Sequence, residues 1–351
     1  MAITLTSLAD LVNSGFDDII DVRAPSEWRI DHLPGAINLP VLDDEERARV
    51  GTIYTQDSPF RARKLGAALV ARNAARHLEG PLIDKPGGWR PLVYCWRGGQ
   101  RSGSFATILA QIGWRVETVA GGYKAWRALV VDALYNQPVA APVVVLDGNT
   151  GTAKTDLLAL LARCGVQVID LEGLARHRGS LFGAMPGGQP SQKAFESALA
   201  LALARLDPAR PVLVEAESSK VGECRVPPKL WRAMVAAPRI AVAAPLAARA
   251  AYLTRAYADL AADGARLAGL IDLLRPAHAA EVIDAWQALA SAGAFEALAT
   301  ALMAEHYDPR YGKHRDRMGG SWVEVAAPSL EPLALQGLAE RIAAELAVLC
   351  P

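Results

Sequence analysis

Short apolar runs that end in polar residues recur along the N-terminal part of the chain. Residues 18–22 and 90–94 are two such runs, and each predicts a buried strand. Residues 6–13 predict a short helix before the first strand. Between the strands, apolar residues recur at helical intervals in a long amphipathic helix that reaches His77. Arg61, Arg63, Lys64, Arg72 and Arg76 place cations along that helix, and we expect most of them to form a solvated face.

The C-terminal part repeats an alternation of apolar strand runs and helical segments. The β-branched run at residues 143–147 is followed by a helix at 156–163, and a further helix is predicted at 195–206. The other predicted strands are residues 166–170, 212–215 and 239–243. Strands separated by helices predict a parallel sheet covered on both faces, an α/β fold. Residues 247–302 are helical in pattern and rich in Ala and Leu.

A proline-punctuated connector at residues 136–142 separates these two patterns. We therefore expect two domains, residues 1–135 and residues 140–351, and 351 residues suffice for two separate cores.

Composition adds little to this picture. Lys plus Arg and Asp plus Glu both number 37, so bulk charge favours no class of partner. The four cysteines show no CxxC pair and no metal-type spacing, which fits free thiols in a reducing compartment and no metal site built on cysteine. The start lacks the basic segment and the continuous apolar run of a secretory signal, and no apolar run is long enough to cross a bilayer. We expect a cytoplasmic protein without membrane contact.

The strand at residues 90–94 leads into a glycine-containing loop that predicts covalent chemistry. Its candidate catalytic residues are Cys95, Arg97, Gly98, Gly99 and Arg101. The glycines allow successive backbone N–H groups to point inward as an anion nest, and Ser102 suits the N-cap of a following helix. A helix N-terminus and two guanidinium groups favour the nucleophilic thiolate, so we expect Cys95 to titrate well below the free-cysteine value of ~8.5. A buried structural cysteine before an ordinary turn is the simpler alternative.

Two further segments resemble parts of a known domain. Asp21-Val22-Arg23 ends the first strand, and His32-Leu33-Pro34-Gly35-Ala36 follows it. With the Cys95 loop and the Gly121-Gly122-Tyr123 turn, they resemble the rhodanese-type sulfurtransferase domain over about residues 4–130. Polar residues such as Asp21 and Arg23 can brace a neighbouring loop, although a solvated turn is an equally good interpretation from physics alone.

The spacing Cys95-x5-Arg101 also matches the loop of protein tyrosine phosphatases, which attack phosphorus from a similar cradle. Those loops usually carry histidine before the cysteine, where this chain has Tyr94. A Cys-x5-Arg phosphatase or a rhodanese-type sulfurtransferase, fused to a P-loop module, stays an alternative.

The strand at residues 143–147 leads into a loop arranged as a P-loop. Backbone N–H groups of such a loop wrap a phosphate at a helix N-terminus, the lysine bridges its oxygens, and the threonine could ligate Mg²⁺. Alanine stands at the last glycine position, which narrows the loop and makes hydrolysis of a nucleotide less certain than phosphate binding. The candidate binding residues are Gly148, Asn149, Thr150, Gly151, Thr152, Ala153, Lys154 and Thr155.

Acidic residues end two strands beside this loop, and two polar runs accompany them. Asp170 and Glu215 lie at strand ends, where ligands bind in open α/β sheets, and Glu217 follows. Glu215 and Glu217 could orient Mg²⁺ or water. The runs at residues 176–180 and 189–193 offer polar donors on irregular backbone, and we expect both near the phosphate site.

The chain closely resembles bacterial tRNA 2-selenouridine synthases. The resemblance is carried by the two loops and the two polar runs, together with the Ser58-Pro59-Phe60-Arg61 insertion and the segment His306-Tyr307-Asp308-Pro309-Arg310. The resemblance implies a rhodanese domain followed by a P-loop domain. It also implies a partner tRNA with wobble 2-thiouridine, which is S-alkylated from geranyl diphosphate and then receives selenium from selenophosphate. By this analogy the P-loop holds the diphosphate and the Cys95 loop handles selenium, with no permanently bound cofactor. A non-enzyme alternative is a P-loop signalling module beside an inert rhodanese domain.

A basic cluster near residue 310 has two interpretations. Arg310, Lys313, Arg315 and Arg317, interleaved with Tyr307 and Tyr311, could contact RNA phosphates and stack on a base. Solvated surface is the equally weighted alternative.

Overall fold

The structure is a computed structural model that describes residues 1–12, 15–315 and 321–349. Its chain divides into two compact units, which are described separately here. The first comprises Met1–Gln137 with Pro190–Arg205, and the second comprises Pro138–Gln189 with Leu206–Pro351.

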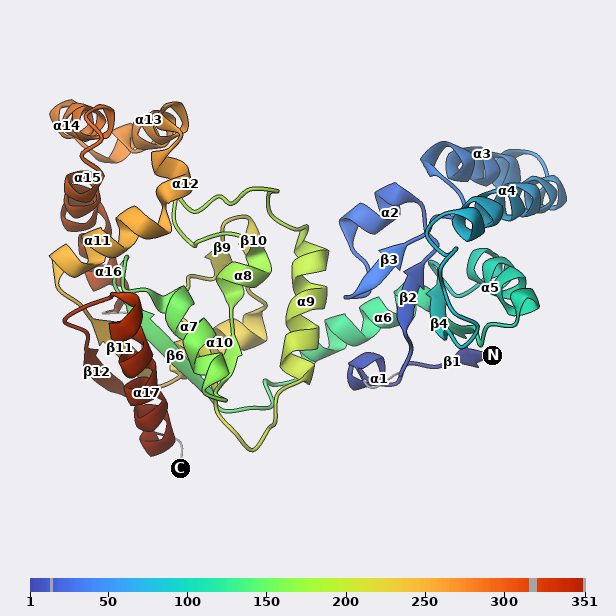
Figure 1. The fold of residues 1–351 in the computed structure, drawn as a ribbon, viewed down its shortest axis with the longest axis horizontal. Coiled ribbons are helices and arrows are strands. Elements are labelled where there is room, and N and C mark those ends of the chain that lie inside the picture. The colour runs from blue at the N-terminus through green and yellow to red at the C-terminus, as the bar shows by residue number, and fades with distance from the viewer. Residues whose placement is uncertain (13–14, 316–320, 350–351) are drawn as a thin grey trace. The chain divides into compact units, whose positions relative to one another are not determined.

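A five-stranded parallel sheet in the order β1-β5-β4-β2-β3 forms the centre of the first unit (Figure 1). Every residue of β4 is buried, because helices cover both faces of the sheet. The strands are Ala2–Ile3 (β1), Asp18–Asp21 (β2), Ala36–Asn38 (β3), Pro91–Tyr94 (β4) and Glu117–Val119 (β5).

Helices α4 and α5 pack on one face of this sheet, where Leu69 and Phe105 join Ile20 and Val93 in one apolar core. Helix α4 is the amphipathic helix that the sequence predicted. Helix α3 precedes it in the chain and packs against it. The helices are Ala9–Val12 (α1), Pro25–Ile30 (α2), Asp44–Gln56 (α3), Pro59–Glu79 (α4), Gln100–Ile112 (α5), Gly122–Val131 (α6), Gln192–Ala204 (α9) and the π-helical turn Asp132–Asn136.

Helix α9 belongs to the first unit although it lies in sequence among elements of the second. It packs on α6: the Trp126 indole N–H donates to Ser197 Oγ at 3.3 Å, and Arg127 forms an ion pair with Glu196. Ser197 Oγ in turn donates to Asp31 Oδ2 at 2.9 Å. The two hydrogen bonds of Ser197 are buried, so α9 is part of this unit's interior rather than an appendage.

The second unit contains another five-stranded parallel sheet, in the order β12-β11-β6-β8-β7. Its strands are Val143–Gly148 (β6), Gln167–Ile169 (β7), Val212–Glu215 (β8), Arg239–Ala243 (β11) and Trp322–Ala326 (β12). A separate antiparallel pair is formed by Lys220–Val221 (β9) and Cys224–Arg225 (β10).

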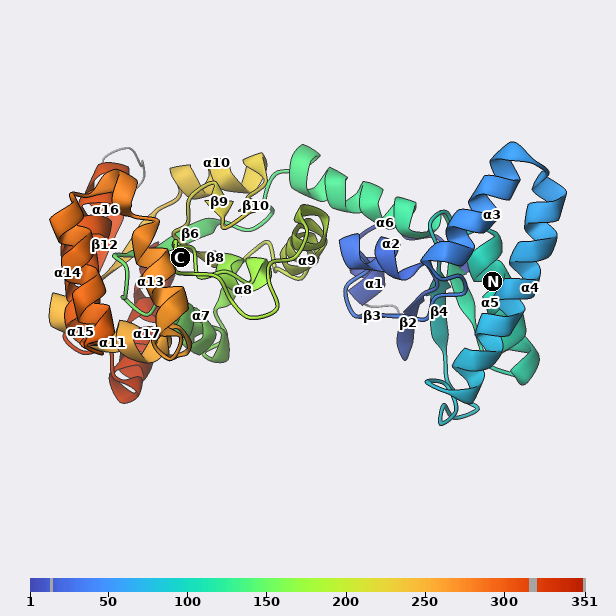
Figure 2. The same ribbon diagram turned by 90° about the horizontal axis from the view of Figure 1, so that it is seen from above.

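Two layers of helices complete this unit. Helices α7 and α17 pack on one face of the sheet, where Leu157 and Ile342 share a core with Val144, and α10 lies on the opposite face (Figure 2). A second apolar core, which includes Trp286 and Leu267, joins the helices that follow β11. The helices are Lys154–Arg163 (α7), Leu171–Ala175 (α8), Pro228–Ala236 (α10), Leu246–Ala256 (α11), Ala258–Ala261 (α12), Gly264–Asp272 (α13), Ala280–Ser291 (α14), Phe295–Leu302 (α15), Asp308–Arg315 (α16) and Pro332–Leu349 (α17), with short turns Arg275–Ala277 and Met303–Tyr307.

The predicted fold class is therefore confirmed: both sheets are parallel and helix-covered, and residues 246–302 are almost entirely helical. Strand β12 and helix α3 were not predicted. No helix among residues 1–12, 15–315 and 321–349 combines the length and hydropathy that a membrane span requires.

Strand order places one loop of each unit where ligands bind in α/β proteins. Strands β2 and β4 are neighbours whose outgoing connections run in opposite directions across the sheet, and β6 and β11 are another such pair. A crevice opens at the carboxyl ends of strands related in this way. The Cys95 loop follows β4 and the P-loop follows β6, so each loop lies where such a crevice opens in its own sheet.

Candidate functional site

The Cys95 thiol lies at the carboxyl end of β4 and is 4% exposed. Helix α5 begins at Gln100 with Gly99 at the N-cap position, so the prediction that Ser102 caps this helix is wrong. Ser102 instead lies inside the first helical turn, and its hydroxyl donates to Cys95 Sγ at 3.2 Å. This hydrogen bond was not anticipated, because a hydroxyl seven residues after the cysteine faces it only once the loop has curled.

The pKa of the Cys95 thiol is lowered below its ordinary value. Burial alone would raise this pKa, but hydrogen bonds from the Ser102 hydroxyl and from the Ser102 and Gly99 amides act against it, as does the charge of Arg101. Together these groups outweigh the desolvation. The direction of this shift is the one expected from the sequence, and its causes are mainly hydrogen bonds rather than two guanidinium charges.

The loop curls through a close contact of two glycines. Gly98 has φ +65°, and a Cβ there would lie 2.4 Å from the Val119 carbonyl oxygen. Gly122 has φ +56°, and its Cβ would lie 2.3 Å from the Cys95 carbonyl oxygen. The first amides of α6 also donate to this loop, from Tyr123 to the Cys95 oxygen at 2.8 Å. Gly99 has φ −103° and open space around it, so loop curvature depends on Gly98.

The two predicted guanidinium groups differ in their surroundings. Arg101 donates to Glu27 Oε2 at 2.7 Å and to Oε1 at 3.3 Å, whereas Arg97 is exposed. Glu27 also pairs with Arg47 at 3.1 Å. Arg101 is therefore held beside the loop by a carboxylate, and Arg97 extends from the loop surface.

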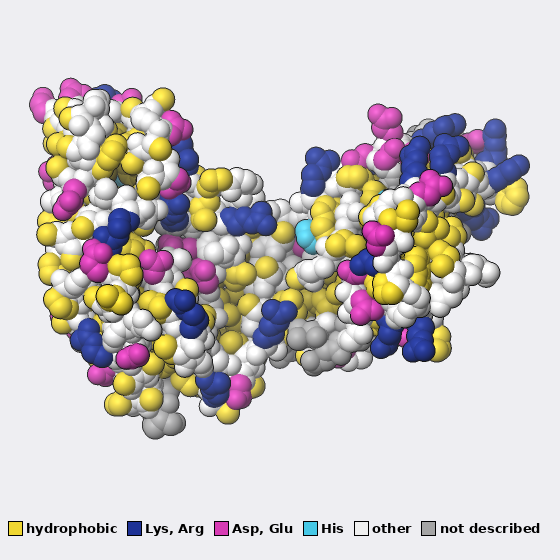
Figure 3. Space-filling model, viewed as in Figure 1, with side chains coloured by type: hydrophobic (Ala, Val, Ile, Leu, Met, Phe, Trp, Pro, Cys, Tyr) yellow, Lys and Arg dark blue, Asp and Glu magenta, His cyan; other side chains and the backbone are white. Residues whose placement is uncertain are grey.

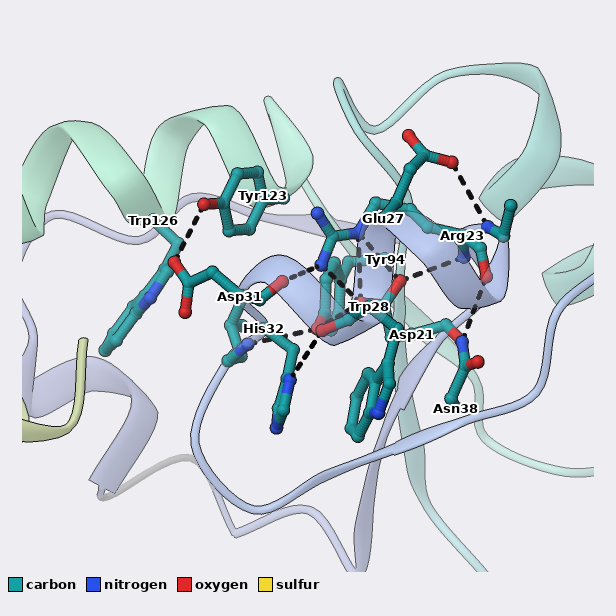
Figure 4. A network of polar contacts seen from close by, with 12 residues as sticks. Asp21, Arg23, Glu27, Trp28, Asp31, His32, Asn38, Tyr94, Tyr123 and Trp126 are labelled. Carbon is teal, nitrogen blue, oxygen red and sulfur yellow. Dashed lines mark hydrogen bonds and ion pairs between the residues drawn. The ribbon is translucent and has the colours of Figure 1, made fainter. Parts of the chain in front are cut away.

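A buried polar network supports the strand ends under this loop (Figure 4). Asp21 and Arg23, 0% and 1% exposed, pair at 2.6 Å, and the Tyr94 hydroxyl donates to Asp21 Oδ2 at 2.8 Å. Arg23 also donates to the Asp31 carbonyl at 2.6 Å and lies over the Tyr123 ring at 4.1 Å. The two residues thus brace neighbouring segments; a solvated turn is excluded by their burial.

The P-loop follows β6 and leads into α7. Gly148 and Gly151 both have positive φ, +151° and +85°, and Thr152 Oγ1 donates to the Asn149 carbonyl at 2.9 Å. An ion pair outside the loop steadies it: Arg249 binds Asp308 at 2.7 Å, donates to the Thr150 carbonyl at 3.2 Å, and the Asn149 amide donates to Asp308 at 3.0 Å. No motif in the sequence points to Arg249, and Asp308 was noted only within the His306–Arg310 segment, without this role.

Ala153 occupies the N-cap of α7 with φ +59° and ψ +31°, the left-handed region that glycine adopts freely. Its side chain is 3% exposed and belongs to the apolar core with Leu157 and Leu158. A residue with a Cβ pays about 1–2 kcal/mol for this conformation. The loop therefore keeps a glycine-like backbone in spite of the alanine, and the packed methyl group offsets part of the strain.

Lys154 and Thr155 begin α7 beside acidic side chains. Lys154 Nζ donates to the Gly148 carbonyl at 3.0 Å. Burial by itself would lower the pKa of this ammonium, but the charges of Tyr311, Glu172 and Glu217 raise it by more. The net pKa lies above the ordinary value, so Lys154 stays charged. Thr155 Oγ1 donates to Glu172 Oε2 at 2.8 Å.

Two carboxyl groups near the P-loop have raised pKa values. Glu215 is 1% exposed and accepts the Glu172 amide at 2.6 Å; burial and the neighbouring acids Asp170 and Glu172 raise its pKa well above the ordinary value. Burial, followed by the repulsion of Glu172, raises the pKa of Glu217 to about 8. In the part of the chain that the structure describes, no three His, Cys, Asp or Glu side chains are arranged to hold a metal ion.

A cavity with about 1830 Å³ of empty volume, part of it open to solvent, lies over the P-loop. Thr150 to Asp156 form its floor, and Lys154, Arg178 and Arg310 bring positive charge to its lining. Arg178 Nη1 is buried without a hydrogen-bond partner among the described residues, so this guanidinium has a donor to spare for an anion.

The two polar runs predicted near the phosphate site have different locations. Arg178, Gly179 and Ser180 line the P-loop cavity as expected. The run at 189–193 does not: Gln189 donates to the Val221 carbonyl at 3.0 Å, and Ser191 caps α9 in the first unit. The expectation for this second run was wrong, because its polar residues satisfy backbone groups of β9 and α9.

The basic cluster near residue 310 is described only in part. Tyr307, Arg310 and Tyr311 line the P-loop cavity. The Lys313 and Arg315 side chains and all of Arg317 lie outside the described residues.

Comparison with known proteins agrees with both units. Residues 4–129 match the rhodanese-like domain, and residues 141–269 match a domain described as the tRNA 2-selenouridine synthase AAA domain. The tRNA 2-selenouridine synthase of Hahella chejuensis is 40% identical over 68% of this chain and 63% of its own length. That of Aeromonas salmonicida is 39% identical over 71% of this chain and 67% of its own length. The chain thus spans about two thirds of these relatives, and it belongs to the tRNA 2-selenouridine synthase family.

Proposed function

We propose that this protein is a tRNA-modifying transferase that converts wobble 2-thiouridine to 2-selenouridine in two steps, S-geranylation and selenation. The observation that carries the proposal is the presence of two distinct anion cradles in one chain. One is the Cys95 loop with a thiol of lowered pKa, and the other is the P-loop with a charged Lys154. Two phosphate-bearing donors, geranyl diphosphate and selenophosphate, would account for two cradles.

In the first step, the thiocarbonyl sulfur attacks C1 of geranyl diphosphate. The C–S bond forms as the C1–O bond breaks, diphosphate leaves with the electron pair, and the N3 proton of the base is lost to solvent. The amides at the start of α7 and the Lys154 ammonium stabilise the charge that develops on this leaving group. Mg²⁺ commonly binds through one or two protein oxygens together with substrate phosphates, and Thr155 and Glu172 are suited to that role.

In the second step, the selenium of selenophosphate attacks C2 of the uracil ring, and the C2–S bond breaks as the geranyl thiolate leaves with the electron pair. Water then cleaves the Se–P bond, which releases inorganic phosphate and leaves selenium on C2. An S-alkylated sulfur is a better leaving group than a thiocarbonyl sulfur, which is the chemical reason for alkylating first. We assign this step to the Cys95 loop. Cys95 and Cys164 are free thiols, which fits a reducing compartment, and we place the reaction in the cytoplasm.

The phosphatase alternative is weakened by Arg101. Arg101 donates to both oxygens of Glu27, and this carboxylate partly neutralises the guanidinium that would have to bind a phosphate. No comparable observation favours a simple sulfurtransferase.

Mutation should separate the two steps. In Cys95→Ser the amide cradle remains but the soft nucleophile is lost, so geranylation should persist, selenation should stop and S-geranyl tRNA should accumulate. Lys154→Ala should weaken geranyl diphosphate binding by about 1.5–3 kcal/mol, the scale of a lost charged hydrogen bond, yet leave selenation of pre-geranylated tRNA intact. Chromatography of digested tRNA reads both steps at once.

Cys164→Ser and Lys193→Ala are the matched controls, because both residues are exposed and lie outside the two loops. Loss of geranylation in a folded Cys95→Ser protein would show that one shared site performs both steps. Equal geranyl diphosphate affinity in Lys154→Ala and wild type would locate the diphosphate elsewhere.

A further inference from the structure

A groove in the N-terminal unit is lined by α3, α4 and the start of α5. Its volume of about 300 Å³ lies at the lower limit of the range of about 300–1,000 Å³ for small-molecule sites. Leu42, Ala62 and Val70 line it and are buried, so the floor of the groove is apolar. We call it the α4 groove.

The rim of the α4 groove is polar and includes one aromatic ring. Tyr54, near the end of α3, lines the groove and is 55% exposed. Arg63 on α4 and Gln100 at the start of α5 also line it, and both are exposed. Arg63 Nε donates to the Pro59 carbonyl at 3.2 Å, and no carboxylate pairs with Arg63 in the part of the chain that the structure describes. The two NH2 groups of this guanidinium are therefore available to a ligand.

The charge around the α4 groove favours an anion. The charged residues among those that line it are Arg63 and Arg101, and none of the described lining residues is acidic. Arg101 is held by Glu27, so Arg63 supplies the uncompensated charge. Lys64 and Arg72 of the same helix are exposed as well. A ligand with several negative charges could thus lie along α4 while one of its groups enters the groove.

A nucleobase has the same division into apolar and polar surfaces as the α4 groove. Its faces stack on aromatic rings, and its edges carry hydrogen-bond donors and acceptors. In the groove, the faces would contact the Tyr54 ring and the apolar floor, and an edge would reach the Gln100 amide. The neighbouring phosphate would contact Arg63. A free anion such as selenophosphate would use only the arginine charge and would gain nothing from the apolar floor.

The α4 groove adjoins the loop to which we assign selenation. Gln100 and Arg101 lie in the first turn of α5, directly after that loop, and Ser102 of the same turn donates to Cys95 Sγ. Cys95 itself is not among the described residues that line the groove. A base in the groove is therefore not the base that reacts at Cys95, but a neighbour of it in the strand.

We propose that the α4 groove binds one unpaired base of the tRNA anticodon loop, next to the wobble base, with its ring stacked on Tyr54. The inference rests on the proposed function, because it gives the tRNA substrate a contact beside the Cys95 loop. Proteins recognise single-stranded RNA in this way, with unstacked bases placed on aromatic side chains. The bound neighbour then holds the strand so that the wobble base faces the loop.

A double-mutant cycle between Tyr54 and the RNA gives the first test. Full-length protein is titrated with an anticodon stem–loop that carries wobble 2-thiouridine, and with two abasic versions that each lack one flanking base. Tyr54→Ala should weaken binding of the intact RNA about fivefold or more, as expected for a lost base–aromatic stack, and change binding of one abasic RNA less than about twofold. Tyr54→Phe keeps the ring and should bind like wild type. Additive effects in both cycles would overturn the proposal.

Filling the groove gives the second test. Ala67 on α4 lines the groove and is exposed, and the next residue, Ala68, is exposed but does not line it. Ala67→Leu should weaken binding of the intact RNA about fivefold or more and leave the same abasic RNA within about twofold, whereas Ala68→Leu should change neither. The affinity for the abasic RNA also reports on folding. Equal effects of the two substitutions on the intact RNA would refute the groove.

The outcomes separate this inference from the proposed function. Wild-type protein that binds none of the three RNAs refutes tRNA as the substrate, and with it the proposed function. Protein that binds all three RNAs equally and is insensitive to Ala67→Leu refutes only the α4 groove. An effect of Tyr54→Ala that is the same on all three RNAs assigns Tyr54 to the RNA backbone and rules out the stacked base.

Discussion

Ser102→Ala is the most direct test of how the Cys95 thiolate is stabilised. The Ser102 hydroxyl donates to Cys95 Sγ at 3.2 Å, and both residues are buried. Its removal deletes one hydrogen bond to the charged form and leaves the amides of the loop in position. The pKa of Cys95 should therefore rise.

The size of the effect follows from the energy of that bond. A hydrogen bond to a charged group contributes about 1.5–3 kcal/mol, and the lower figure corresponds to a roughly tenfold smaller thiolate fraction where the thiol form predominates. A more basic thiolate is also more nucleophilic. With a Brønsted coefficient of about 0.4–0.5, the rate constant for alkylation of the thiolate rises about threefold. Alkylation at such a pH should thus be about threefold to fivefold slower, and the plateau at high pH about threefold faster.

Iodoacetamide alkylation measured across pH, with Cys95 followed by peptide mass spectrometry, gives both quantities. Ser104→Ala is the matched control, because Ser104 lies two residues further along α5 and is exposed. The slower rate and the higher plateau must occur together. A pH profile of Ser102→Ala that superimposes on that of Ser104→Ala would refute the role of this hydroxyl.

Three other substitutions test separate features. Ala153→Val should lower the free energy of unfolding by about 2 kcal/mol or more, because a β-branched side chain is strained at φ +59° and overpacks the core, whereas exposed Ala159→Val should not; urea denaturation compares them. Glu217 has a pKa of about 8 in the folded protein, so the folded state keeps this proton over a pH range in which the unfolded state has lost it. The stability of the wild type should therefore fall as the pH rises from about 5 through 8. Glu217→Gln should reduce this pH dependence, which urea midpoints at pH 6 and 9 measure. If α4 contacts tRNA, Arg63→Glu should weaken binding and reduce the log–log salt slope by about 1, whereas Arg115→Glu should not; unchanged filter binding by Arg63→Glu would remove α4 from the interface.

The last of these rests on the surface of α4. Arg61, Arg63, Lys64, Arg72 and Arg76 are all exposed. Dark-blue side chains gather over the region where Figure 1 labels α3 and α4 (Figure 3). Two exposed aromatic residues precede these cations in sequence: Tyr54 near the end of α3 and Phe60 near the start of α4. Cations and aromatic rings together are the side chains that single-stranded RNA uses, so this surface is a better candidate for tRNA than the chain's neutral net charge suggests.

The parts of the fold that the sequence predicted depend on local patterns. The run Val143 to Asp147 is apolar and β-branched, which is sufficient to identify a central parallel strand, and the glycine and Lys-Thr loop after it identifies the P-loop. Strand β12 could not be found in this way. It is an edge strand that is mostly exposed or half-exposed, and its pairing partner β11 lies some eighty residues earlier.

The residues missed at the candidate sites have a common cause. Arg249 and Asp308 act through contacts that form only when distant segments meet, and Ser102 reaches Cys95 only once the loop has curled, so no local spacing marks these roles. Ala153 is the opposite case, because the sequence marked the residue but could not give its conformation. The sequence identified the departure from glycine correctly, but only the backbone angles show that the loop keeps a left-handed conformation there.

The inclusion of α9 in the N-terminal unit has a consequence for how the chain is synthesised. A polypeptide that ends at Gln137 has the whole first sheet but lacks Ser197, and so leaves the Trp126 indole and the Asp31 carboxylate without that partner. At about 5–20 residues per second, the ribosome needs several seconds more to reach Arg205. During that interval the P-loop segment has already emerged. The N-terminal unit therefore cannot finish folding before the next unit has begun, and the chain cannot be cut into two linear halves that each retain all of their interior.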